Sequence, residues 1–169
     1  AKFQKYLGRR LLSDVYFGAP YDLAMSADGK FLYSANENGY LYVLQPDPVD
    51  QSITPYQVYA LQLADPGNAP ILVTEPLPEV ADPDNPIRSS FGPERLQISA
   101  DQNWLFVMGW KGLLVFPRDL DTGALTQVAA SHLNNPKDIV VSNDNRYVYA
   151  FADGQLDIIS FDLISHQWE

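Results

Sequence analysis

One block of sequence occurs three times in this chain, at residues 20–44, 93–116 and 136–159. Each copy contains a proline, a short apolar segment, a Ser-x-Asp turn, an aromatic residue that opens a second segment, a glycine turn and a third segment. The second and third copies begin roughly 40 residues apart, and self-similarity at such a period is typical of repeat architectures. Each copy therefore predicts one structural unit that stacks against equivalent neighbours.

The residue types in the block are those of β-strands joined by tight turns. Its first segment carries apolar residues two apart, such as Leu23 and Met25, which is the period of a pleated strand. Ser and Asp satisfy backbone donors in the following turn, and the next residue is Gly29, Gln102 or Asn145, of which Gln102 is the poor fit to a turn. The aromatic residues that follow are expected to fill the space between units: Phe31, Trp104 and Tyr147.

This order predicts an all-β fold of β-propeller blades, each with four antiparallel strands. We interpret residues 1–169 as a single β-propeller-type domain with three blades. Outer strands are expected at residues 54–61 and 124–129, and the third blade is expected to lack its own. The expected divisions are a closing outer strand and linker at 1–18, blade 1 at 19–61, an insertion at 62–90, blade 2 at 91–130 and blade 3 at 131–169.

The insertion is acidic and rich in proline, including Pro66, Pro76 and Pro83. Because proline cannot donate to a strand ladder, we expect an extended loop that lies over the propeller or projects from it. The apolar triplet Ile71-Leu72-Val73 is expected to be anchored to the rest of the protein.

Three blades are fewer than the roughly four to eight with which propellers close. The sequence is therefore that of a partial propeller or of half an assembled ring. Residues Phe3 to Leu12 have the length of an outer strand, and we expect them to complete the last blade beside Leu156 to Phe161, in the same chain or in a partner. Two copies could form a six-bladed ring, so a homodimer is expected.

Composition restricts the partners. The formal net charge of −10 repels phosphate backbones and argues against nucleic acid. Cysteine is absent, which excludes disulfides, thiolate metal sites and a cysteine nucleophile, and leaves the compartment open. No segment approaches the ~20 apolar residues of a membrane span. A protein or a small polar ligand is the partner that we expect.

Residues 20–33 follow the pattern Pro-x-x-Leu-x-x-Ser-x-Asp-Gly-x-x-x-Tyr, and Asp-Thr-Gly occurs at 121–123. This pattern resembles the YVTN-type and lactonase-like repeats of seven-bladed propellers. Relatives with such repeats include sugar-lactone hydrolases, surface-layer and cell-envelope binding proteins, and propeller domains of quinone- or haem-dependent dehydrogenases. The resemblance implies the fold and favours a periplasmic or extracellular location, and the chain departs from the family in having three blades.

Few residues suggest catalysis. The histidines His132 and His166 lie in or near outer strands, where they are poorly placed to form a triad or a two-histidine metal site together. Gly109-Trp110-Lys111-Gly112 is a hairpin without the strand-to-helix context of a phosphate-binding loop. No catalytic residue is therefore assigned.

Ligands of propellers usually bind at one end of the central channel, where the innermost strands begin. A charged residue recurs there in every blade, and Trp110 lies at a hairpin tip on the same side, so we expect a ligand site at Asp22, Glu94, Arg95, Lys137, Asp138 and Trp110. Such a site suits a polar ligand or a hard cation such as Ca²⁺, and no cofactor is otherwise expected. The alternative is that these side chains form salt bridges or satisfy strand ends.

Three functions remain. The first is a noncatalytic binding or assembly module, because the chain offers no convincing nucleophile, base or metal cluster. The second is a lactonase-like hydrolase, or part of one, in which Glu94 or Asp22 acts as a base or holds a metal that activates water. The third is a propeller domain of a larger redox or cell-envelope protein.

Overall fold

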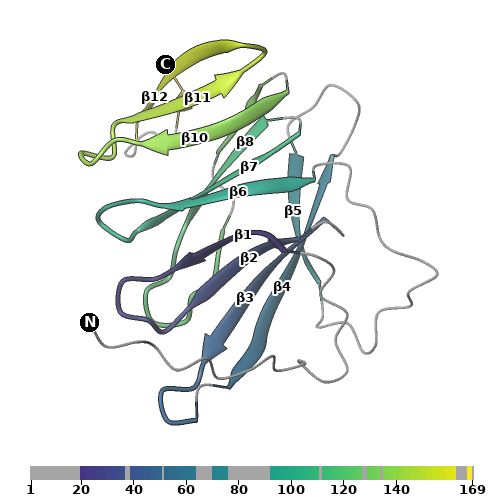
Figure 1. Ribbon diagram of the computed structural model, residues 1–169, viewed down its shortest axis with the longest axis vertical. Helices are drawn as coiled ribbons and strands as arrows, with labels where there is room; N and C mark the ends of the chain where they lie inside the picture. The colour runs from purple at the N-terminus through teal and green to yellow at the C-terminus, as the bar shows by residue number, and fades with distance from the viewer. Residues whose placement is uncertain are drawn as a thin grey trace, which may run out of the picture.

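The computed structural model of the protein describes residues 20–36, 39–50, 52–63, 70–75, 92–110, 112–126, 129–133, 135–162 and 167–168. Within these residues the regular structure consists of strands alone, arranged in three antiparallel sheets. The sheets lie side by side like consecutive sectors of a ring, with the third at the top of Figure 1 and the first below the second. The fold is all-β and consists of the blades of a partial β-propeller, as the repeat predicts.

Each sheet follows chain order from its innermost strand outwards. Blade 1 contains β1 (Pro20–Met25), β2 (Leu32–Asn36), β3 (Tyr40–Pro46), β4 (Ile53–Leu63) and β5 (Pro70–Glu75). Blade 2 contains β6 (Pro93–Ile98), β7 (Trp104–Gly109), β8 (Gly112–Pro117) and β9 (Ala129–His132). Blade 3 contains β10 (Pro136–Val141), β11 (Tyr147–Ala152), β12 (Gln155–Asp162) and β13 (Gln167–Trp168).

The insertion differs from the extended loop predicted by its prolines, because β5 pairs with β4 along six residues. Proline is compatible with this strand because Pro70 is its first residue and β5 lies at the sheet edge. The anchoring of Ile71-Leu72-Val73 is confirmed, since these residues pair with Gln62, Leu61 and Ala60 of β4.

The outer strands of the other two blades also differ from the sequence expectation. In blade 2 the described strand begins at Ala129, and of the described residues 124–126 only Leu125 pairs, in an isolated bridge with Arg118. In blade 3 a short β13 pairs with Phe161 and Asp162 of β12, where no outer strand was expected. The segment Phe3 to Leu12 lies outside the described residues, so its pairing stays a prediction.

The Ser-x-Asp turn has the same hydrogen bonds in all three blades. In the first, Ser26 Oγ donates to Asp28 Oδ1 at 2.7 Å and accepts from the Phe31 amide at 3.0 Å. Ser99 and Ser142 make the equivalent pairs of bonds. The hydrogen bond from Ser26, followed by that from the Lys30 amide, lowers the pKa of Asp28 to about 2. Each turn therefore fixes the point at which the second strand begins.

Apolar side chains fill both spaces between blades. Phe31 and Tyr33 of blade 1 pack with Leu105 and Phe116 of blade 2. Trp104, Phe106 and Met108 of blade 2 pack with Val148 and Ala150 of blade 3. The expectation that the ring opening the second strand fills the gap between blades holds for Phe31 and Trp104, which are 1% and 9% exposed.

The loop after β8 reaches back to blade 1. Gly123, at φ +68°, lies against the ring of Phe31, and its carbonyl accepts from the Tyr33 hydroxyl at 3.0 Å. The buried Arg118 guanidinium lies over the Tyr33 ring, 5.0 Å from its centroid, and donates from Nε to the Tyr33 hydroxyl. The Asp-Thr-Gly at 121–123 thus helps to hold blade 2 on blade 1.

Candidate functional site

A β-bulge marks the beginning of each innermost strand. Pro20 pairs with Asn36 and Asp22 pairs with Ala35, so that Tyr21 between them is the extra residue. The same irregularity occurs between Pro93 and Arg95 in β6 and between Pro136 and Asp138 in β10. Bulges re-aim side chains and are frequent next to functional sites. Five of the six predicted site residues lie at these three bulges: Asp22, Glu94, Arg95, Lys137 and Asp138.

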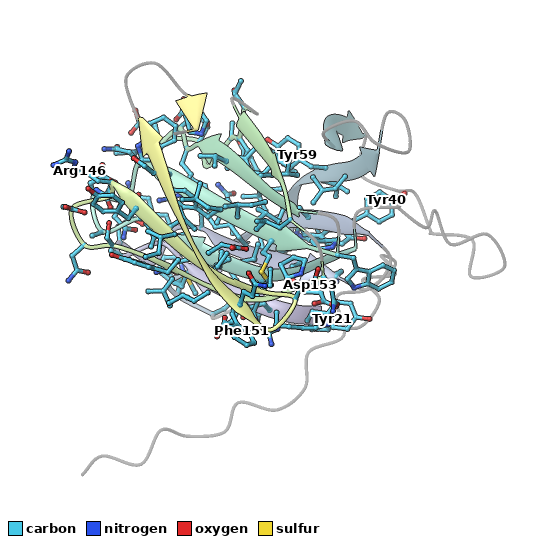
Figure 2. The ribbon with its side chains drawn as sticks, turned by 90° about the horizontal axis from the view of Figure 1, so that it is seen from above. Tyr21, Tyr40, Tyr59, Arg146, Phe151 and Asp153 are labelled. Carbon is cyan, nitrogen blue, oxygen red and sulfur yellow. The ribbon has the colours of Figure 1, made fainter. Side chains whose placement is uncertain are left out.

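The three bulges lie at one end of the blades, which we call the bulge end. Figure 2, seen from above, places Tyr21, Phe151 and Asp153 toward one end of the blades and Arg146 at the opposite end. The hairpin that carries Trp110 joins β7 to β8 and opens at the bulge end as well. The predicted residues therefore share one end of the molecule.

Asp22 joins two blades. One carboxylate oxygen accepts from the Leu23 amide at 2.9 Å and the other accepts from the Leu96 amide of blade 2 at 2.8 Å. This carboxylate satisfies strand ends, which is the alternative that the sequence left open. Asp22 is thereby fixed in place, with its oxygens already committed to backbone donors.

Arg95 and Asp138 form a loose ion pair between blades 2 and 3, with 3.9 Å from Nε to Oδ1. Arg95 also donates from Nη1 to the Glu94 carbonyl at 2.9 Å, and Asp138 Oδ1 accepts from the Ile139 amide at 3.0 Å. Both charged side chains are largely exposed, so the ion pair contributes little to stability. They remain accessible to a ligand, as does the exposed Lys137.

Trp110 is half exposed and yet held in a defined orientation. Its indole Nε1 donates to Glu94 Oε1, and 52% of the residue is accessible to solvent. One face of the indole lies on Gly92, where an added Cβ would come within 2.8 Å of the ring. Gly92 was not a predicted site residue, although it directly precedes the repeat proline Pro93. Only the fold shows that Trp110 covers it.

Neither histidine has a side chain among those that the structure describes at the bulge end. The backbone of His132 pairs with Gly112 at the end of β9, the outermost strand of blade 2. His166 lies outside the described residues. Their independence from the site stays a prediction.

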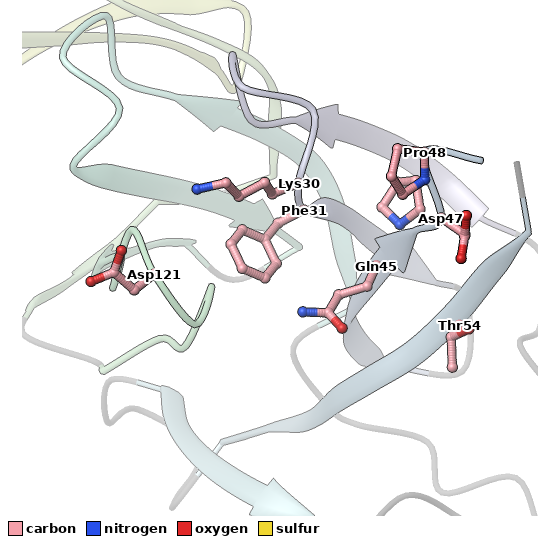
Figure 3. A pocket seen from close by; sticks show the side chains of 8 residues that line it. Lys30, Phe31, Gln45, Asp47, Pro48, Thr54 and Asp121 are labelled. Atoms are coloured by element: carbon pink, nitrogen blue, oxygen red, sulfur yellow. The ribbon is translucent and has the colours of Figure 1, made fainter.

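The described residues also line an open cavity of about 430 Å³ at the opposite end of blade 1. Figure 3 shows Lys30 and Phe31 on the Ser-x-Asp turn, Gln45 and Thr54 on β3 and β4, and Asp121 reaching in from blade 2. Its volume is within the range of ligand pockets. The sequence does not predict this cavity, because its lining comes from segments far apart in the chain. Within it, Lys30 forms an ion pair with Asp28 at 3.3 Å.

Neither a metal site nor a membrane helix is found in the described part of the chain. Among those residues no group of three or more His, Cys, Asp or Glu side chains could hold a metal ion. No helix there is long and apolar enough to cross a membrane. The bulge end, as far as it is described, offers carboxylates, two cations and an indole.

Comparison with known proteins identifies the fold and leaves the family open. No family model matches the sequence, and no curated protein matches it. Among solved structures, the chain is similar to a periplasmic gluconolactonase from Pseudomonas aeruginosa, with 22% identity and a TM-score of 0.68. It is also similar to a putative 6-phosphogluconolactonase from Bacteroides fragilis, with 18% identity and a TM-score of 0.66.

Both alignments cover 90% of this chain and 38% of the other protein. The chain thus spans less than half the length of these structures. At such identities the similarity shows a lactonase-like propeller fold, and the chemistry must be argued from the residues at the bulge end.

Proposed function

We propose that this chain is a noncatalytic binding module that holds a small polar ligand at the bulge end, against the indole of Trp110. The observation that carries the proposal is the fixed, half-exposed indole, oriented by Glu94 and seated on Gly92. An aromatic side chain that is already immobilised loses little conformational entropy when a ligand stacks on it. An exposed ring held only by its own backbone would lack this advantage.

The surrounding charges indicate the ligand class. Arg95 and Lys137 offer donors to an anionic group, and the outward face of Trp110 suits the apolar face of a sugar ring or polyol. Carboxylates at the same end can accept from hydroxyl groups. A sugar acid combines these features, so we take D-gluconate as the probe.

The carboxylates favour binding over hydrolysis. Both oxygens of Asp22 accept from backbone amides, and Glu94 accepts from Trp110. A general base must take a proton from water or substrate, and the backbone and indole donors compete for the same oxygens of these two carboxylates.

A lactonase-like hydrolase remains the second candidate, supported by the names of the two similar structures. In that case Glu94 or Asp22 would act on the lactone, and turnover would be lost in Glu94→Gln or Asp22→Asn. The two gluconolactonase-type neighbours, one of them periplasmic, also favour a periplasmic or extracellular location for this chain. A role as a domain of a larger redox or cell-envelope protein is the third candidate.

The test is calorimetric titration of the protein with D-gluconate and with glucono-δ-lactone, combined with lactone hydrolysis followed by pH-stat. We expect saturable gluconate binding that Trp110→Ala weakens by about tenfold or more, equivalent to 1.4 kcal/mol. Lys30→Ala in the cavity at the opposite end is the matched control and should bind like the wild type. Lactone hydrolysis above the spontaneous rate would favour the hydrolase, and the absence of binding would refute the proposal.

A further inference from the structure

The extra residue at the bulge has a different chemistry in each blade, although its backbone position is the same. It is Tyr21 in blade 1, Glu94 in blade 2 and Lys137 in blade 3. The position two residues further along is apolar in every blade: Leu23, Leu96 and Ile139. The shared backbone geometry therefore does not set the residue type at the bulge. A ligand that meets a different group at each blade accounts for the change from aromatic to acidic to basic.

The three bulges lie in a row across the blades. Asp22, beside the first bulge, accepts from the Leu96 amide of β6 at 2.8 Å. Arg95, beside the second, is 3.9 Å from Asp138 of the third, measured from Nε to Oδ1. Figure 1 shows β1, β6 and β10 as successive strands in the same order. A ligand that crosses the bulge end thus passes blades 1, 2 and 3 in turn.

Both ends of this row offer side chains for binding. Tyr21 is 46% exposed, and its hydroxyl makes no hydrogen bond to any residue that the structure describes. Lys137 is exposed and forms no ion pair within the described residues. In the middle, Glu94 accepts from the Trp110 indole, so the group presented there is the half-exposed ring of Trp110. The row therefore runs from a phenol through an indole to an ammonium group.

We propose that the ligand at the bulge end is an aldobionic acid, which is a sugar acid that carries one further sugar ring. This inference rests on the proposed binding of a sugar acid against Trp110 and extends it to all three blades. The sugar ring stacks on Tyr21, the polyol chain of the acid lies on Trp110, and the carboxylate pairs with Lys137 and Arg95. The Tyr21 hydroxyl donates to a hydroxyl group of the sugar.

Two simpler ligands each leave part of the row unused. A sugar acid alone covers Trp110 and the cations and does not reach Tyr21. A neutral disaccharide covers both rings and leaves Lys137 and Arg95 without an anionic group. Three probes separate these cases: lactobionate, which is an aldobionic acid; D-gluconate, which lacks its sugar ring; and lactitol, which has an alcohol in place of its carboxylate.

The test is calorimetric titration of the full chain with each probe. We expect lactobionate to bind about tenfold or more tightly than both gluconate and lactitol. Tyr21→Ala should remove the advantage of lactobionate over gluconate, whereas Tyr21→Phe, which keeps the ring, should retain most of it. Tyr56→Ala is the matched control and should retain all of it, because Tyr56 is 40% exposed and lies 6.5 Å from Phe31 between ring centroids, at the other end of blade 1.

Lys137→Met tests the direction of the ligand. It should weaken lactobionate by about fivefold or more and leave lactitol unchanged, with Lys30→Met as the matched control. An equal loss for lactobionate and lactitol would overturn the placement of the carboxylate.

The titrations also distinguish this inference from the proposed function. Gluconate binding with no advantage for lactobionate, or an advantage that survives Tyr21→Ala, would overturn the inference and leave the proposed function standing. The absence of binding by all three probes would refute both.

Discussion

Single residues determine how closely the blades approach one another, and a glycine permits a close approach because it has no side chain. Gly123 and Gly29 both have φ near +70°, at +68° and +73°. A Cβ on Gly123 would lie 2.5 Å from the Phe31 ring, whereas a Cβ on Gly29 would meet no atom within 4 Å. Alanine at Gly29 would therefore introduce backbone strain alone, whereas alanine at Gly123 would introduce the same strain and a steric clash with Phe31.

Both Gly123→Ala and Gly29→Ala should lower the free energy of unfolding by roughly 1–2 kcal/mol, because alanine is strained at positive φ. Gly123→Ala should cost about 1–3 kcal/mol more, since Phe31 must move within a packed core. Urea denaturation of the two variants measures the difference. Equal losses would show that the blade 2 loop does not rest on Phe31 as described.

The two histidines provide a second prediction at this scale. Replacing His132 and His166 together with Asn should leave gluconate affinity within about threefold of the wild type, which is below 1 kcal/mol. The reason is that the expected site uses the bulges and Trp110. A loss above about tenfold in calorimetric titration would place a histidine in the site.

At the scale of elements, the Ser-x-Asp turns link stability to pH. Hydrogen bonds from Ser26 and Ser142 are the first causes of the lowered pKa values of Asp28 and Asp144, and the pKa of Asp101 is lowered as well. A carboxyl group whose pKa is lower in the folded state stabilises the fold above its unfolded pKa, which is 3.8 for these residues. That contribution is lost as pH falls toward the folded value, about 2 for Asp28.

We therefore expect the urea midpoint to fall between about pH 4 and pH 2, and Asp144→Asn to make this fall shallower. Equilibrium urea unfolding at several pH values checks the slope. A wild-type slope retained in Asp144→Asn would mean that the turn carboxylates are not responsible.

The outer edge of blade 3 supports a further element-scale prediction. Within the described part of the chain, β12 pairs with β13 through Phe161 and Asp162 alone. If Phe3 to Leu12 covers the rest of β12, deleting residues 1–12 exposes a strand edge and should cause gross destabilisation or aggregation. Thermal melting and light scattering of the truncated protein test this, and an unaltered, soluble monomer would contradict it.

How much the sequence predicts also depends on the scale of the element. The repeat and its turns are local, so the blades, the Ser-x-Asp turns and the charged positions at the beginning of each innermost strand follow from residue order. The pairing of β5, the contact of Gly123 with Phe31 and the seat of Trp110 on Gly92 join segments far apart in the chain. No local pattern encodes these contacts. Gln102, which fits its turn poorly by residue type, is explained by the hydrogen bond that its side chain accepts from the Ala27 amide of the neighbouring blade.

At the scale of the whole molecule, the three blades form an arc whose two ends differ. The bulge end holds charges and a fixed indole, and the opposite end holds the cavity around Phe31. Blade 3 exposes its outward face, whereas the faces between blades are filled with apolar side chains.

The most direct measurement of the central claim is a titration with D-gluconate followed by NMR of the indole protons. The chain has three tryptophans, of which Trp104 is 9% exposed and Trp110 is 52% exposed. We predict a saturable shift of the signal that is missing in Trp110→Phe, with the Trp104 signal unchanged. A shift confined to amides around Lys30 and Phe31, or no shift at any concentration, would contradict ligand binding at the bulge end.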